Sequence, residues 1–154
     1  GLESCSGMIL GMGEGRRGVV EILFELAAQK VRSIPINFLL SLDGTTVGTP
    51  EKLTPEYCLR VLCLARLTNP AAEIRAAAGR ELHLRSLQPL ALYPANSLFM
   101  DGYLNVMGEA QRQTLQMIRD AGFEIESESG APFEETPSQG QPVLKGRAEL
   151  HPTR

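Results

Sequence analysis

The feature that most constrains the fold is an alternation of strand-like and helix-like segments, which repeats four times along the chain. The expected strands lie near residues 3–9, 33–40, 73–78 and 95–100, and the expected helices near residues 17–29, 54–69, 80–93 and 109–121. Such alternation predicts parallel strands that are joined by helices. Because four βα units are half of an eight-stranded barrel of about 250 residues, we predict an α/β chain that forms half of a TIM-type (β/α)8 barrel.

Three of the expected strands carry a polar side chain on one face. Side chains in a strand alternate between two faces, so the apolar residues at positions 34, 36, 38, 74, 76 and 78 share the face that helices must cover. Asn37 and Arg75 lie on the opposite face, and Cys5 shares a face with Gly7, which leaves room beside the thiol. This pattern predicts a site inside the barrel that contains Cys5, Asn37 and Arg75.

A half barrel has two open strand edges, and long open edges favour pairing with another chain. The sequence enters its first expected strand directly after Gly1 and Leu2, with no preceding element to cover that strand. We therefore expect either an incomplete polypeptide or one that needs a partner.

Composition narrows the function classes. The chain has 154 residues, of which 43% are hydrophobic, enough for one sizeable core. Its net charge is −3 and it has no lysine- or arginine-rich run, so we expect neither a nucleic-acid partner nor a membrane surface. No apolar run approaches the roughly 18 residues of a membrane span, and no leader-like segment opens the sequence. We expect a cytoplasmic protein.

Local signals place the helices. In the segment 17–29, a stripe of Val20, Leu23, Phe24 and Ala27 is expected to be buried. The sequence Thr54-Pro55-Glu56 predicts a helix start, because it combines a hydroxyl N-cap, a proline at the first helical position and an acid in the first turn.

The three cysteines have no disulfide-framework spacing, and in a reducing compartment they are expected to be thiols or ligands. Cys58 and Cys63 fall on the second expected helix, where Leu59, Leu62 and Cys63 form the predicted buried stripe, so both thiols are expected to pack rather than react. Cys5 is therefore the cysteine of chemical interest.

The composition changes after residue 126. Residues 127–154 are rich in Gly, Pro, Ser, Glu and Gln and poor in apolar residues, so burial cannot offset their ordering entropy. We predict one domain over residues 1–126, followed by a disordered tail.

Several motifs, in matching order and spacing, resemble biotin synthase. They are Cys5–Glu14, Pro35–Leu39, Glu73–Arg75, Ala78–Glu81 and Ala95–Phe99. The resemblance covers residues 1 to about 125 and is to the C-terminal half of that enzyme, including the region shared by biotin and thiamin synthesis proteins. It implies that this chain forms the C-terminal half of the barrel.

The resemblance also implies the chemistry. Biotin synthases are radical S-adenosylmethionine enzymes, in which a 4Fe-4S cluster held by a C-x3-C-x2-C motif generates a 5′-deoxyadenosyl radical. That radical abstracts hydrogen from dethiobiotin, and a 2Fe-2S cluster then donates the sulfur of biotin. In this chain the resemblance assigns Cys5 and Arg75 as ligands of the 2Fe-2S cluster. Without it, an ion pair of Arg75 with Glu73 is the favoured interpretation, since a guanidinium stays protonated.

The same resemblance assigns the substrate and cofactor contacts. Asn37 corresponds to the asparagine that contacts dethiobiotin, and its amide suits a cyclic urea; a buried asparagine bonded to backbone is the alternative. Ile9 and Leu40 correspond to adenine-contacting positions of the S-adenosylmethionine site. Gly11 and Gly13 form the neighbouring turn, where glycine lets a backbone approach a nucleotide closely.

The chain departs from the family in its cysteines. It lacks the C-x3-C-x2-C motif and the two other cysteines of the 2Fe-2S site, so it is expected to be inactive alone, and the 4Fe-4S cluster would enter only through the missing N-terminal half-barrel. Two alternatives remain: a separately encoded subunit that completes a barrel, and a non-catalytic binding or structural domain that retains Cys5, Asn37 and Arg75 as relics. A homodimer is suggested by resemblance only.

Overall fold

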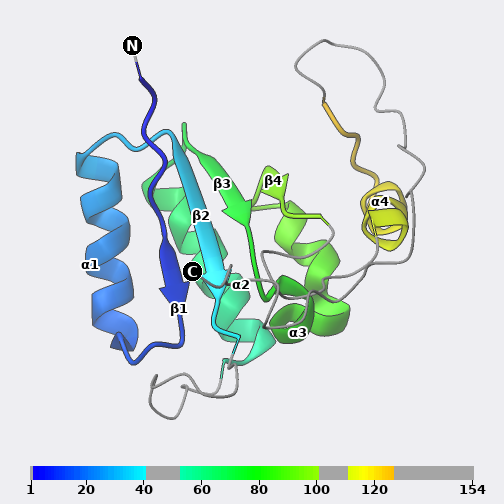
Figure 1. Ribbon diagram of the computed structural model, residues 1–154, viewed down its shortest axis with the longest axis horizontal. Helices are drawn as coiled ribbons and strands as arrows, with labels where there is room; N and C mark the ends of the chain where they lie inside the picture. Colours follow the sequence, from blue (N-terminus) through cyan, green and yellow to red (C-terminus); the bar gives the residue numbers. More distant parts are fainter. Residues whose placement is uncertain (1, 41–52, 101–110, 127–154) are drawn as a thin grey trace, which may run out of the picture.

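A computed structural model describes residues 2–40, 53–100 and 111–126, and within these ranges the chain forms one sheet covered by helices (Figure 1). The strands are β1 (Met8–Leu10), β2 (Ser33–Phe38), β3 (Glu73–Ala76) and β4 (Ser97–Leu98), all parallel and ordered β1-β2-β3-β4. The helices are α1 (Gly15–Ala28), α2 (Pro55–Thr68), α3 (Arg80–Leu84), the 3-10 helix η1 (Arg85–Leu92) and α4 (Gln111–Asp120). The predicted α/β class and the four βα units are confirmed, and the sheet is compatible with half of a TIM barrel.

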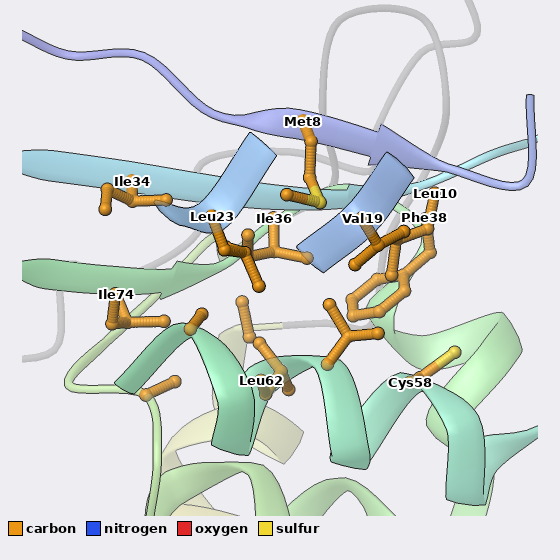
Figure 2. Packing of buried hydrophobic residues seen from close by; sticks show 14 of the residues in the cluster. Met8, Leu10, Val19, Leu23, Ile34, Ile36, Phe38, Cys58, Leu62 and Ile74 are labelled. Carbon is orange, nitrogen blue, oxygen red and sulfur yellow. The ribbon is translucent and has the colours of Figure 1, made fainter. Parts of the chain in front are cut away.

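The core lies between the sheet and the helices. Figure 2 shows Met8 and Leu10 of β1 and Ile36 of β2 pointing toward the same layer as Leu23 of α1 and Leu62 of α2. Along β2 and β3 buried residues alternate with half-buried ones, as the sequence pattern predicted. One face of the sheet is therefore covered by helices, and the other is left for the polar side chains.

The predicted buried stripe of α1 is wrong in part. Val19, Leu23 and Leu26 are buried, whereas Val20 and Phe24 are 38% and 58% exposed. Both stripes are apolar and lie about 100° apart around the helix. Periodicity alone could not separate them, and the contact with the sheet selects the stripe that contains Val19.

The stripe predicted for α2 also needs correction. Cys58, Val61, Leu62 and Ala65 are buried, but Cys63 is exposed. The buried face is formed by residues 58, 61, 62 and 65, and Cys63 lies roughly 150° around the helix from the centre of that face. The predicted packing role holds for Cys58 and is wrong for Cys63.

Helix ends follow the local signals. The Thr54 hydroxyl accepts a hydrogen bond from the Tyr57 N–H at 3.3 Å, which confirms the predicted N-cap of α2. Gly122, with φ of 79°, follows α4 and donates its N–H to the Arg119 carbonyl at 2.9 Å. The third helical stretch becomes 3-10 after Leu84, with Pro89 inside it, since proline cannot donate a helical hydrogen bond.

Two expectations fall outside the described residues, namely the start of the last helix at 109–110 and the tail at 127–154. In the described part of the chain, every helix is too short or too polar to cross a lipid bilayer.

Candidate functional site

The strand register arranges the inner face of the sheet, opposite the helices, in rows. In one row Cys5 pairs with Ser33, which in turn pairs with Glu73. In the next row Pro35 pairs with Arg75, and Arg75 with Ser97. In a third row Ile9 pairs with Asn37. Cys5, Asn37 and Arg75 therefore share one face of the sheet but occupy three different rows.

Cys5 is exposed and lies just before β1, where an isolated bridge to Ser33 fixes its place. The predicted room beside it is not open space. A Cβ on Gly7 would lie 1.9 Å from the Pro35 carbonyl oxygen, so the glycine is required by the close approach of two backbones.

Arg75 contacts three neighbouring side chains. Its Nη2 donates to Glu73 Oε1 at 2.5 Å, and its Nε donates to the same oxygen at 3.1 Å and to Ser97 Oγ at 3.0 Å. Its guanidinium carbon lies 5.5 Å from the centre of the Phe99 ring. The ion pair with Glu73, favoured from the residues alone, is thus present on the inner face.

The Glu73 carboxyl of this pair is ionised in the folded protein. Burial raises the pKa of the Glu73 carboxyl, but hydrogen bonds from Arg75 and Ser97 and the positive charge of Arg75 outweigh burial, so the pKa lies below its usual value. Glu73 is therefore ionised at neutral pH, and the pair with Arg75 carries no net charge.

Asn37 makes backbone hydrogen bonds on both sides. Its Oδ1 accepts from the Ala78 N–H at 3.2 Å, and its Nδ2 donates to the Met8 carbonyl at 3.4 Å. The backbone hydrogen bonds of the alternative interpretation are thus present, although Asn37 is half-buried rather than buried. An amide has two donor hydrogens and two acceptor lone pairs, so one of each remains for a ligand.

The turn between β1 and α1 is fastened by a carboxylate. Gly11 and Gly13 have φ of 97° and 99°, which only glycine adopts without strain. Glu14 accepts hydrogen bonds from the N–H groups of Gly11 and Met12, both at 2.9 Å. Ile9, just before this turn, is 46% exposed on the inner face.

Leu40 is half-buried and lies at the end of a described range, because residues 41–52 are outside it. The residue before it, Leu39, donates its N–H to the Leu10 carbonyl at 2.9 Å. That bond ties the carboxyl ends of β1 and β2 together, at the end of the sheet where the turn with Gly11 lies.

Sequence reasoning assigned no role to three polar residues. Ser97 could have been found from the strand register, since it pairs with Arg75 across β3 and β4. Glu14 is three residues from Gly11, and its role depends on the geometry of the turn. Arg80, whose side chain is 1% exposed, pairs with Glu81 and also donates to Thr114, a contact over 34 residues that no local pattern could indicate.

Metal-binding capacity is incomplete in this chain. Across residues 2–40, 53–100 and 111–126, no three His, Cys, Asp or Glu side chains gather as a metal site. Cys58 and Cys63 lie on α2, away from the inner face. Within the described residues, the inner face therefore offers the thiol of Cys5 and the guanidinium of Arg75, with the Glu73 carboxylate already bonded to that guanidinium.

Comparison with known proteins identifies the family to which this chain is similar. The Biotin and Thiamin Synthesis associated domain matches residues 35–124. A biotin synthase of Acaryochloris marina is 55% identical over 129 residues, which are 84% of this chain and 37% of that protein. One of Leptospira interrogans is 53% identical over 130 residues, and one of Geobacillus kaustophilus is 52% identical over 126 residues. These cover 84% and 82% of this chain and 37% and 38% of the relatives, so the chain spans less than two fifths of their length.

Proposed function

The chain belongs to the Biotin and Thiamin Synthesis associated domain family and matches the C-terminal portion of biotin synthases, and on this premise we propose that it is part of an enzyme that converts dethiobiotin to biotin. The reaction would be sulfur insertion by radical S-adenosylmethionine chemistry. The observation that carries the proposal is that Cys5, Asn37 and Arg75 share the inner face of the sheet.

Cys5 and Arg75 would hold one side of a 2Fe-2S cluster. A thiolate is the usual ligand of such clusters, and the Cys5 thiol is exposed on the inner face. Arg75 lies on the same face, where its guanidinium contacts Glu73 and Ser97. The bound cluster would supply the sulfur atom. Two further ligands would come from residues outside this chain.

Asn37 would orient dethiobiotin. Its remaining N–H and lone pair are complementary to the C=O and N–H of a cyclic urea. Because its other two groups are fixed by Met8 and Ala78, the amide plane has one orientation and the ligand would find it preorganised.

The exposed side chain of Ile9 would contact the adenine of S-adenosylmethionine, together with Leu40 at the carboxyl end of β2. The turn with Gly11 and Gly13 would let the backbone approach that ligand closely. The ends of parallel strands are where ligands bind in such folds.

The remaining half of the barrel would pair along the open edges of β1 and β4. It would carry the C-x3-C-x2-C motif and the 4Fe-4S cluster, and this chain would be inactive without it. A homodimer of the completed barrel is part of the same proposal.

The test uses the native polypeptide that carries this sequence, or this chain co-expressed with its N-terminal half if the native polypeptide has the mass of 16.8 kDa. After anaerobic reconstitution with iron and sulfide, iron content, visible absorption and dethiobiotin binding would be measured. We expect Cys5→Ala to lose the 2Fe-2S absorption and Asn37→Ala to weaken dethiobiotin binding by about tenfold. Cys63→Ala is the matched control, since that thiol lies on the helix side.

Two results would overturn the proposal. Wild-type protein that binds neither iron nor dethiobiotin would point to a non-catalytic domain. Equal loss of absorption in Cys63→Ala and Cys5→Ala would show that Cys5 is not a specific ligand of the cluster. If the protein binds iron and dethiobiotin only after a separately encoded half is added, the chain is a split subunit with the proposed chemistry.

A further inference from the structure

We propose that Glu73 is the positioning residue for Arg75, and that it fixes the guanidinium so that the Nη1 edge faces the ligand on the inner face of the sheet. The contact of Arg75 with a cluster rests on the proposed function, whereas the fixing of Arg75 by Glu73 does not. Glu73 itself has no assigned role in the site described above.

The first step is the geometry of the guanidinium. Glu73 Oε1 accepts from both Nη2 and Nε of Arg75, at 2.5 and 3.1 Å. Ser97 Oγ accepts from Nε at 3.0 Å, and the Phe99 ring lies 5.5 Å from the guanidinium carbon. One edge and one face are thus occupied by the protein. The Nη1 edge is the edge that these contacts leave for a ligand.

The second step is the rigidity of the pair. Glu73 and Arg75 lie two residues apart on β3, so their side chains leave the same face of one strand. No loop has to close to bring them together. A free arginine side chain has many rotamers, and a side chain on a strand is held more precisely than one on a loop.

The third step is the environment of the pair. The side chains of Arg75 and Glu73 are 28% and 35% exposed. The ion pair of Arg17 with Glu21 on α1 has similar chemistry, but its side chains are 91% and 62% exposed. Water competes less for the inner pair, so Glu73 restrains Arg75 more strongly than Glu21 restrains Arg17. Glu21 therefore offers a matched control.

The experiment compares Glu73→Ala, Glu73→Gln and Glu21→Ala in the native polypeptide. The primary readout, in protein without iron, is solvent exchange of the Arg75 Nε–Hε proton by NMR, assigned by its absence in Arg75→Lys. We expect exchange to rise about tenfold in Glu73→Ala as the restraint opens. It should rise less in Glu73→Gln, which keeps an oxygen acceptor, and should not change in Glu21→Ala. Thermal unfolding shows whether each variant is folded. If Glu73→Ala is not folded, Glu73→Gln alone tests the restraint on Arg75.

A second readout uses protein loaded with iron and sulfide. We expect Glu73→Ala to keep the iron content but to change the visible and EPR spectra of the cluster in the same direction as Arg75→Lys, with partial rescue in Glu73→Gln. Unchanged Arg75 exchange in both Glu73 variants would overturn the proposal. Released Arg75 with an unchanged spectrum in Glu73→Ala would also overturn it, while leaving the proposed function intact. If wild-type protein assembles no cluster, the proposed function fails, and the exchange measurement still decides whether Glu73 fixes Arg75.

Discussion

The side-chain oxygen of Asn37 accepts a hydrogen bond from the backbone N–H of Ala78 at 3.2 Å. The other end of the same amide donates to the Met8 carbonyl at 3.4 Å. One side chain on β2 thus joins β1 to the chain that follows β3. Asn37 therefore stabilises the sheet at the place where the proposed substrate would bind.

Asn37→Ala should lower the free energy of unfolding by about 1–2 kcal/mol, because it leaves the half-buried Ala78 N–H without its acceptor. The measurement is urea unfolding followed by circular dichroism. Gln29→Ala is the control, since Gln29 bonds to Glu25 on the exposed side of α1 and its loss should change stability by less than about 0.5 kcal/mol. Equal stabilities of the two variants would show that the Asn37 bonds contribute nothing to the fold.

The faces of the strands could be predicted because alternation in β2 is unambiguous. Ile34, Ile36 and Phe38 are all buried, and a slip of one residue would expose all three. The same alternation placed Asn37 and Arg75 on the inner face. The location of the candidate site therefore followed from the sequence, although its hydrogen bonds did not.

The rotation of the helices could not be predicted in the same way. On α1 two neighbouring stripes are apolar, and only contact with the sheet decides that Val19 is buried and Phe24 is exposed. Arg80 shows the second limit. Its side chain is buried because Glu81 and Thr114 surround its charge, and Thr114 comes from a distant helix. Local patterns contain no information on such a contact.

Gly79→Ala should lower the free energy of unfolding by about 3 kcal/mol or more. Gly79 has φ of 79°, and a Cβ there would lie 2.1 Å from the Phe38 carbonyl oxygen, which is backbone and cannot move aside cheaply. Gly15→Ala is the matched control, because Gly15 has φ of 63° but open space around it. That variant should cost only about 1–2 kcal/mol of backbone strain. Equal losses in urea unfolding would exclude the clash as the cause.

The three thiols should differ in reactivity. Burial raises the pKa of the Cys58 thiol to about 11, partly opposed by a backbone hydrogen bond, and the side chain is inaccessible. Only the thiolate reacts, and at pH 8 the Cys58 thiol is ionised in only about one thousandth of the protein molecules. We expect iodoacetamide to label exposed Cys5 and Cys63 first, and Cys58 only after unfolding, as measured by peptide mass spectrometry. Labelling of Cys58 at the rate of Cys63 in folded protein would contradict the buried position.

The ion pair of Glu73 with Arg75 should make stability depend on pH. The pKa of folded Glu73 lies below the ordinary value of 4.5, so its contribution is present above that value and is lost as pH falls through the folded pKa. Glu73→Gln keeps the size of the side chain and removes the charge. Because both partners are about a third exposed, the wild type should exceed the variant by only about 0.5 kcal/mol at pH 7. In urea unfolding that difference should shrink as the pH falls below 4.5 and disappear below the folded pKa, and it should also be absent in an Arg75→Gln background. A difference that grows toward acid pH would mean that the folded state raises this pKa, and the pair would then not be an ion pair.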